Sequence, residues 1–300
     1  MNLQYLRYAL EISRTGSISK AAENLSVAQP NLSRAVKELE GSLGISIFER
    51  TRTGMTVTPE GERLLSAGER ILREVGELET MFDGETVPRS TLSVCAAPAA
   101  YLAHAFVSFC AALPEDGLFE TRYSEGTLNE VLDAVTRGTA KLGIVRIPLH
   151  FEKYYTDKLT ERDLKWETVA EFSPVVLAGL GSPLAGKETV TPMSLSEVNQ
   201  VISPETVPLE QSGRETSPKK EITVTDRATA YSLLSNDPTL CITAPPMPSF
   251  LAAQLGLIQR PAFDATVYRD LLICQRSYRL TDTDEAFLRA LKGTARATKE

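Results

Sequence analysis

A short run of polar side chains between residues 29 and 37 has the chemistry needed to contact DNA. These side chains are Gln29, Asn31, Ser33, Arg34 and Lys37. Amide groups can pair with adenine edges, a guanidinium with guanine or a phosphate, and a hydroxyl with a phosphate. The same stretch carries apolar side chains at helical spacing: Leu32, Val36, Leu39 and Leu43. Because Pro30 fits a first helical turn, the pattern predicts an amphipathic helix that ends near Gly44 and suits the major groove.

Two further helices are needed to hold such a helix in place. Ser17 can cap a helix that follows Gly16, because its hydroxyl can accept a backbone N–H two or three residues on. The apolar residues of that helix are Ile18, Ala21, Ala22 and Leu25. An upstream helix, roughly Leu3 to Arg14, supplies the third packing element. The pattern indicates a helix-turn-helix, and Ser17 joins the candidate DNA contacts.

A small hairpin is predicted after this unit. Residues 45–50 alternate with period two as a strand does, residues 51–54 form a turn, and residues 55–58 return. Arg50 and Arg52 lie near the tip of this wing, where they could touch the DNA backbone or the minor groove.

In order, these residues resemble the winged helix-turn-helix of the LysR-type transcriptional regulators over about the first eighty residues. The segments that carry the resemblance are Lys20-Ala21-Ala22-Glu23-Asn24-Leu25, Gln29-Pro30-Asn31-Leu32-Ser33-Arg34, Leu39-Glu40-Gly41-Ser42-Leu43-Gly44, Ile47-Phe48-Glu49-Arg50 and Val57-Thr58-Pro59-Glu60-Gly61. The resemblance implies that Gln29 and Pro30 approach bases, and that Ser33, Arg34 and Arg50 hold phosphates. Ala28 departs from the family, which has Ser or Thr there, so a helix cap worth about 1 kcal/mol is missing.

The alternative is a three-helix unit that packs on protein and contacts no DNA. Any one of these residues alone would favour that interpretation, since a Gln or Ser on a helix face is usually only solvated. The whole pattern in order favours DNA binding.

Composition and charge agree with a regulator built from several domains. The chain has 300 residues, is 42% hydrophobic and 24% charged, and carries a formal charge of −7. Through Thr58 it has seven Lys or Arg against five Glu, so the acidity lies in the remainder. No charged-then-apolar leader and no membrane-length apolar run is found, which predicts a cytoplasmic protein that does not bind membranes.

Metal, redox and enzymatic chemistry find little support. The four cysteines lie far apart in apolar stretches, at Cys95, Cys110, Cys241 and Cys274, which is typical of buried small hydrophobes. The redox-sensing branch of the family uses a cysteine pair in mid-sensor, and no cysteine lies between 110 and 241. Two histidines are too few for a metal site, and no phosphate loop or nucleophile elbow is present. We expect no catalytic site, metal or cofactor.

A long helix is predicted from residue 59 to 82. Its apolar seam follows spacings of three and four: Gly61, Leu64, Gly68, Ile71, Val75, Leu78 and Phe82. This heptad-like seam predicts pairing with a second helix, with Gly68 allowing close approach; the alternative is a helix packed on its own domain. Two reading helices related by a twofold axis would bind an interrupted palindrome in double-stranded DNA. The resemblance implies such a homodimer, often doubled into a homotetramer.

After a hinge at 83–90, the rhythm changes to alternating strands and helices, which predicts parallel α/β sheets. The layout resembles the two-lobed, periplasmic-binding-protein-like effector domain of the same family. The predicted fold is therefore multidomain: an all-α winged helix-turn-helix with a small β wing (1–58), a linker helix (59–82), and an α/β effector domain (91–300). The first lobe is expected at 91–163 and 267–300, and the second at 164–266.

Ligands of α/β folds gather at strand C-termini and helix N-termini. The candidate effector segments are Ala97-Pro98-Ala99-Ala100, Glu125-Gly126-Thr127, Arg146 and Ser203-Pro204-Glu205. In relatives that sense carboxylates, a Thr like Thr127 and an Arg like Arg146 lie in the cleft. Arg146 could pair with a ligand carboxylate or, equally, with a nearby Glu of the protein. The first segment lacks hydroxyls, which indicates a less polar ligand or backbone contacts only.

The sequence thus predicts a DNA-binding transcriptional regulator controlled by a small-molecule effector, which could be a carboxylate. Two alternatives stay open. An enzyme would lose turnover on substitution of Arg146 without binding DNA, and a ligand-binding module with a vestigial DNA end would be insensitive to replacement of Gln29 and Arg34.

Overall fold

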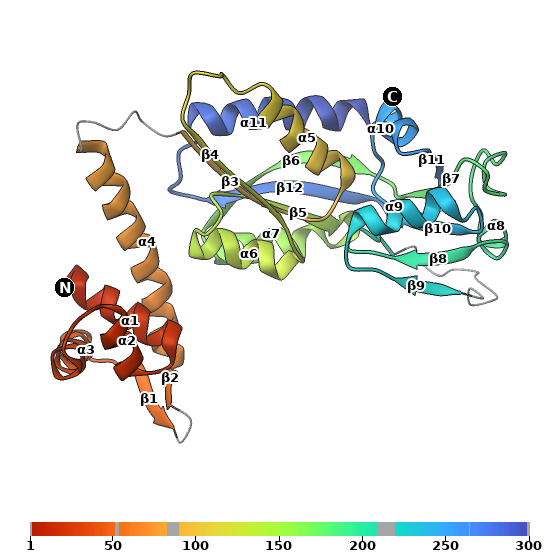
Figure 1. Cartoon of the computed structure of the whole chain (residues 1–300). Helices are drawn as coiled ribbons and strands as arrows, with labels where there is room; N and C mark the ends of the chain where they lie inside the picture. The colour runs from red at the N-terminus through yellow and green to blue at the C-terminus, as the bar shows by residue number, and fades with distance from the viewer. Residues whose placement is uncertain (1, 52–53, 83–89, 209–219, 264, 299–300) are drawn as a thin grey trace. The chain divides into compact units, whose positions relative to one another are not determined.

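The computed structural model describes residues 2–51, 54–82, 90–208, 220–263 and 265–298. The chain divides into two compact units, Met1–Pro88 and Arg89–Glu300, drawn in Figure 1. Each unit has its own hydrophobic core and is described by itself.

Three helices build the core of the first unit: α1 (Leu3–Thr15), α2 (Ile18–Asn24) and α3 (Gln29–Leu43). Asn2 caps α1 by accepting the Gln4 backbone N–H, and Ser17 caps α2 as predicted. The apolar faces meet in one cluster whose fully buried members include Leu6, Ile12 and Leu32. The helix-turn-helix arrangement expected from the apolar spacing is confirmed.

The wing is a two-stranded antiparallel hairpin of β1 (Phe48–Thr51) and β2 (Gly54–Val57), in which Phe48 pairs with Val57. The first strand begins three residues later than predicted. Gly54 has a φ of +135°, and a Cβ at this position would lie 2.7 Å from the carbonyl oxygen of Gly16. Because the Met55 N–H also donates to that oxygen at 2.9 Å, the hairpin is fixed against the turn between α1 and α2.

Helix α4 (Pro59–Phe82) follows Thr58, whose hydroxyl accepts the Gly61 N–H. In its first half, the predicted pairing seam faces its own unit. Gly61 is buried against Ile47, and a Cβ at Gly68 would lie 3.1 Å from a methyl carbon of Leu6 in α1. Gly68 therefore makes room for a side chain of α1. At this position α4 packs on its own domain, which is the alternative that the sequence left open. The side chains of Leu78 and Phe82 lie outside the described residues, so pairing through the second half stays a prediction.

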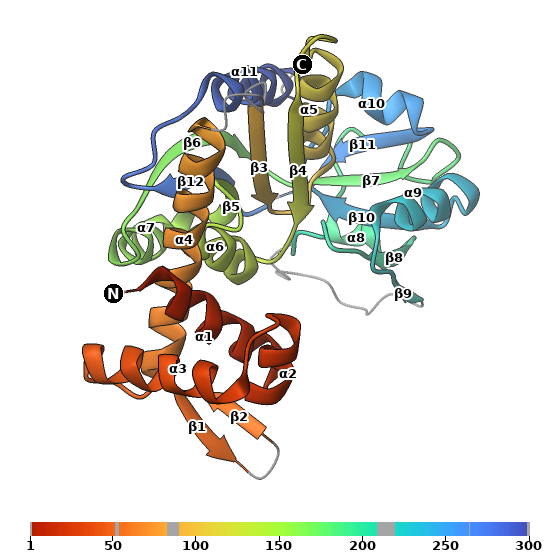
Figure 2. The same ribbon diagram turned by 60° about the vertical axis from the view of Figure 1, so that its left-hand side comes forward.

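The first sheet of the second unit has the strand order β4-β3-β5-β12-β6. Helices α5 and α11 cover one face and α6 and α7 the other, as Figure 2 shows. The elements are β3 (Ser90–Ala96), α5 (Ala100–Ala111), β4 (Phe119–Glu125), α6 (Leu128–Arg137), β5 (Leu142–Pro148), a 3-10 turn (Leu149–Phe151), α7 (Glu152–Glu161), β6 (Leu164–Phe172), β12 (Tyr268–Gln275) and α11 (Asp282–Ala297). This three-layer arrangement forms the first lobe.

The second sheet has the strand order β11-β7-β10-β8-β9 and builds the second lobe. Its core lies between the sheet and helices α9 and α10. The elements are β7 (Val175–Gly179), α8 (Pro192–Leu195), β8 (Asn199–Ile202), β9 (Glu221–Thr223), α9 (Arg227–Asn236), β10 (Leu240–Ala244), α10 (Ser249–Gln254) and β11 (Leu257–Pro261).

Two features of the second unit differ from the prediction. Strand β6 pairs with β12 over its whole length, so residues 164–172 belong to the first sheet and not to the second lobe. The sheets are also mixed: β12 is antiparallel to β5 and β6, and β7 is antiparallel to β10 and β11. Alternating strands and helices do not reveal this, because the crossing strands come directly from the other lobe. The predicted hinge, 83–90, lies almost wholly outside the described residues.

The cysteines Cys95, Cys241 and Cys274 are buried and Cys110 is half-buried, and none of the four forms a disulfide. Across the described ranges, no helix is both long enough and apolar enough to cross a membrane. The described side chains likewise contain no group of three His, Cys, Asp or Glu that could hold a metal ion.

Candidate DNA-binding surface and inter-lobe polar network

Helix α3 presents the polar face that the sequence predicts. Leu32, Val36 and Leu39 are buried in the core, while the opposite face is solvent-accessible. On that face Gln29, Pro30, Asn31, Arg34 and Lys37 are exposed, and Ser33 is half-buried. The cap at Ala28 has extended backbone and no side-chain hydrogen bond, and the Asn31 N–H donates to the Ala28 carbonyl at 3.0 Å instead.

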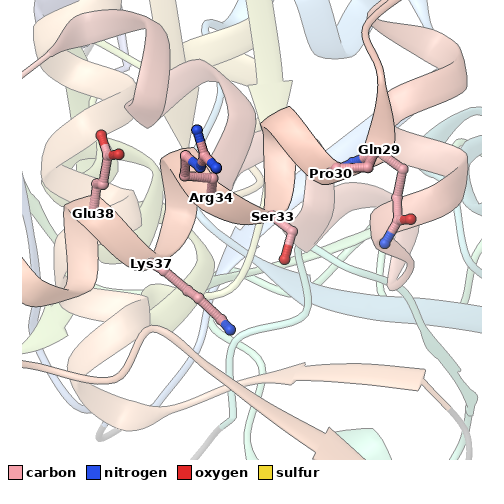
Figure 3. A pocket seen from close by; sticks show the side chains of 6 residues that line it. All are labelled: Gln29, Pro30, Ser33, Arg34, Lys37 and Glu38. Atoms are coloured by element: carbon pink, nitrogen blue, oxygen red, sulfur yellow. The ribbon is translucent and has the colours of Figure 1, made fainter.

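Two rows of side chains with a spacing of four line a surface hollow on α3 (Figure 3). Gln29, Ser33 and Lys37 project to one side of the helix. Arg34 and Glu38 project to the other side, and Pro30 lies at the helix start. Residues four apart lie one above the other on a helix. An amide, a hydroxyl and an ammonium are therefore brought together on one accessible row.

The charges around this face favour contact with an anion. Within the described residues, neither Arg34 nor Lys37 has an ion-pair partner. The acidic side chains nearby are engaged elsewhere: Glu38 accepts the Tyr5 hydroxyl at 2.9 Å, and this bond raises the pKa of Tyr5. Glu40 accepts the backbone N–H of Ile47 at 2.7 Å. Two cations are thus left for an external partner.

Glu40 is a positioning residue that the sequence analysis did not single out. Its carboxylate also accepts the Phe48 N–H at 3.3 Å, so it ties the end of α3 to the first strand of the wing. Glu40 belongs to the Leu39-Glu40 pair of the family pattern, but its contact with the wing becomes visible only in the structure. Ser17 is half-buried and occupied as the α2 cap. Arg52 and the side chain of Arg50 lie outside the described residues.

In the second unit, Arg146 has a partner within the protein. Its guanidinium donates to both carboxylate oxygens of Asp270, at 2.9 and 2.7 Å, and to the Pro98 carbonyl at 3.0 Å. Asp270 is fully buried and also accepts the Tyr101 hydroxyl. Burial lowers the pKa of Arg146, but the Asp270 charge outweighs it, so the guanidinium pKa lies above its ordinary value. Of the two predicted partners of Arg146, a ligand carboxylate or a Glu of the protein, the structure shows a carboxylate of the protein, but it is an Asp.

The other predicted effector residues have structural surroundings of their own. Ala97, Ala99 and Ala100 are buried and Pro98 is half-buried, and Ala100 packs into the core of the second lobe. Thr127 caps α6 in a reciprocal capping box with Glu130. The Ser203 hydroxyl is buried and, among the described residues, has no hydrogen-bond partner.

A second charged cluster joins the lobes, and the sequence predicted only part of it. Arg227, at the start of α9, donates to Glu205 at 2.8 Å and, across to the end of β4, to Glu125 at 2.5 Å. Glu125 also accepts the Tyr123 hydroxyl at 3.0 Å. Glu125 and Glu205 lie in predicted segments, whereas Arg227 and Tyr231 were missed. The helix start after Asp226 was the available signal, because helix N-termini at strand ends were expected to line the site.

Burial sets the proton affinities in this cluster. Burial raises the pKa of Glu205, and the Arg227 charge only partly opposes it. The pKa of Tyr231 is raised by burial and then by the Glu205 charge. The Arg146 charge also acts on Tyr123, and the Glu205 charge acts on Arg146. The two clusters therefore form one electrostatic network between the sheets, which we call the inter-lobe network: Tyr101, Tyr123, Glu125, Arg146, Glu205, Arg227, Tyr231 and Asp270.

The first unit is a winged helix-turn-helix whose α3 presents an accessible polar face with two cations, Arg34 and Lys37. Residues 3–62 match the family described as "Bacterial regulatory helix-turn-helix protein, lysR family". Residues 3–62 are therefore similar to the helix-turn-helix domain of the LysR family.

Curated relatives share mainly this region. An uncharacterized HTH-type transcriptional regulator, YcgK of Bacillus subtilis, is 42% identical over 78 residues, which are 26% of this chain and 24% of the relative. The HTH-type transcriptional regulator CzcR of Bacillus cereus is 30% identical over 164 residues, 54% of this chain and 56% of CzcR. These alignments span between about a quarter and just over half of the relatives' own length.

Solved structures match the fold over nearly the whole chain. Full-length OxyR from Pseudomonas aeruginosa has a TM-score of 0.57 at 18% identity, covering 99% of this chain and 95% of OxyR. CbnR, a LysR family transcriptional regulator, has a TM-score of 0.56 at 16% identity, covering 98% and 99%. At such identity the likeness shows the fold, which is the predicted one: an N-terminal helix-turn-helix followed by a two-sheet α/β domain.

Proposed function

We propose that this chain is a sequence-specific DNA-binding transcriptional regulator whose DNA binding or promoter activation is controlled by a small molecule in the second unit. The observation that carries the proposal is the exposed face of α3, where Gln29, Arg34 and Lys37 stand without competing partners among the described residues. The relatives that match this domain are themselves named as transcriptional regulators. A regulator of this kind is expected in the cytoplasm.

We further propose that Gln29, Pro30 and Asn31 read bases, while Ser33, Arg34, Lys37 and the wing arginines Arg50 and Arg52 bind phosphates. Ser17 contributes by capping α2 and so fixing its N-terminus at the DNA. CbnR has been solved with its target DNA. Two such units, paired through the second half of α4 as a homodimer or homotetramer, would bind an interrupted palindrome.

The test is selection of duplexes from a random library by the full chain, followed by fluorescence anisotropy on the selected sequence. Replacing Gln29 with Ala should cost about 1–3 kcal/mol of binding free energy on the selected site, because one base contact is lost. The same variant should bind random DNA as the parent chain does.

Replacing Arg34 with Ala should weaken selected and random DNA alike and reduce the slope of log affinity against log salt by about 1. The matched control is Arg289→Ala, which removes an exposed cation of α11 and should leave binding unchanged. An affinity for selected DNA no higher than for random DNA would disprove sequence-specific binding.

A further inference from the structure

The inter-lobe network holds more negative than positive groups, and its cations are already paired. It contains two guanidinium groups, Arg146 and Arg227, against three carboxylates, Asp270, Glu125 and Glu205. Arg146 is engaged by both oxygens of Asp270, and Arg227 lies between Glu125 and Glu205. An incoming carboxylate would therefore have to displace a carboxylate of the protein from one of these arginines.

That displacement is costly at Asp270 in particular. Its side chain is fully buried, so moving Arg146 to a ligand would leave a buried charge without its partner. The pairing of Arg146 thus removes the main feature that pointed to an acidic ligand.

The network has acceptor atoms to spare. Glu205 is 2% exposed, and its Oε1 atom has no hydrogen-bond partner within the described residues, since Arg227 takes only Oε2. The Tyr231 hydroxyl is also buried and, among the described residues, forms no hydrogen bond of normal length and angle, although it interacts with the Glu205 carboxylate strongly enough for its own pKa to be raised. Ser203, two residues before Glu205, carries a third buried oxygen for which the described part of the chain provides no partner.

Buried acceptors without partners are rare in proteins, because each loses its bonds to water and gains nothing in return. A ligand that donates hydrogen bonds would remove this cost, and a positive charge on it would also favour the ionised form of Glu205, which burial disfavours. A ligand carboxylate would do neither.

We propose that the small molecule bound by the second unit is an organic cation with a primary ammonium group, which donates to Glu205 Oε1 and to the Tyr231 hydroxyl. The proposal deepens the proposed function and rests on it, since it names the class of the controlling molecule. Within the network the Arg227–Glu125 pair is partly exposed, with 19% and 26% of the two side chains accessible. Because that pair joins β4 of the first lobe to α9 of the second, a molecule bound there sits where the lobes meet.

The experiment compares amines with carboxylates of matched size and shape on the full chain at neutral pH. The probes are putrescine against adipate, each with four methylenes, and benzylamine against benzoate. Calorimetric titration should show saturable binding of at least one amine and none of its matched carboxylate. Binding of a carboxylate without its matched amine, or of no amine, overturns the proposal.

Two variants locate the site. Glu205→Gln should weaken amine binding by more than tenfold, because a hydrogen bond between charged groups is lost. Tyr231→Phe removes only the hydroxyl group and should weaken binding several-fold without loss of folding. The matched control is Glu188→Gln, an exposed carboxylate of the same lobe, which should bind as the parent chain does. Equal binding by all three variants would place the amine elsewhere and overturn the proposal.

Anisotropy on the selected duplex separates this inference from the proposed function. An amine that binds at Glu205 and shifts DNA affinity or the length of the protected site supports both. An amine that binds there without changing DNA binding supports the ligand class and contradicts its regulatory role. Intact DNA binding with no amine binding contradicts the ligand class and leaves the DNA-binding function standing.

Discussion

On α3, the amide, hydroxyl and cationic side chains are exposed and largely free of partners, whereas in the inter-lobe network the same kinds of group are buried and bonded to one another. Arg34 lies on the surface hollow without an ion-pair partner in the described parts of the chain. Arg146 makes a bidentate pair with Asp270 across 124 positions of sequence. Arg34 is therefore available to a partner outside the chain, whereas Arg146 is held by the protein itself.

This contrast shows why the polar face of α3 could be predicted from the sequence, while the pairing within the inter-lobe network could not. A reading helix is a local element, so its polar face follows from the spacing of its apolar residues. A buried network is assembled from distant strands, and the role of each member depends on who pairs with it. The pairing in the network depends on Asp270, Glu205 and Arg227. Their positions in the sequence do not indicate which residues they pair with.

The largest effect is expected where a buried pair is broken. Asp270→Asn should reduce the free energy of unfolding of the second unit by about 3–5 kcal/mol, because Arg146 would keep its charge in a buried site without a counterion. Urea unfolding can be followed by the fluorescence of Trp166, the single tryptophan of the chain, which lies on β6 opposite Ile273.

The matched control is Asp133→Asn. Asp133 pairs with Arg162 at 3.5 Å, but its side chain is 53% exposed, so the loss should stay within about 1 kcal/mol. Equal urea midpoints for the two variants would show that the Arg146 pair is no more important than a surface pair.

In the first unit, the substitution expected to cost most stability changes backbone conformation and removes no charge. Gly54→Ala should destabilise the unit by about 1–3 kcal/mol and weaken DNA binding, because it forces a side chain onto a φ of +135° and against the Gly16 carbonyl. Gly41→Ala makes the same substitution inside α3, with nothing within 4 Å, and should stabilise by about 0.5–1 kcal/mol. Thermal unfolding by circular dichroism tests the two signs; destabilisation by both variants would contradict the account.

Local elements could likewise be predicted from the sequence, whereas contacts between distant residues could not. The helices of the first unit, the Ser17 cap and the missing cap at Ala28 follow from local rules, and all are observed. The seam of α4 was half misread, because Gly68 receives Leu6 of α1, a contact that spacing alone cannot distinguish from a partner helix. The place of β6 in the first sheet was missed, since sheet membership is decided by β12, about a hundred residues later.

Thr127 offers a smaller test, because the sequence predicted it as an effector residue and the structure shows it as a cap. Thr127→Ala should cost about 1 kcal/mol of stability through loss of the α6 capping box. Thr281→Ala removes the same motif from α11 and should cost a similar amount. If Thr127 acts only as a cap, both variants bind the amine probes equally; weaker binding by Thr127→Ala alone would assign it a ligand contact.

The smallest effect concerns an exposed ion pair of the first unit. Hydrogen bonds from Arg14, at 2.6 Å, and from Asn24 lower the pKa of Glu11 to about 2 from an ordinary 4.5. Since the folded pKa is the lower one, the stabilisation is fully present above pH 4.5 and is lost as the pH falls towards 2. Carboxyl-carbon NMR should show Glu11 titrating near 2, and Glu11→Gln should remove this part of the acid sensitivity. A titration midpoint near 4.5 would mean that the pair does not persist in solution, as is common for exposed pairs, and that the end of α1 is held to α2 by packing alone.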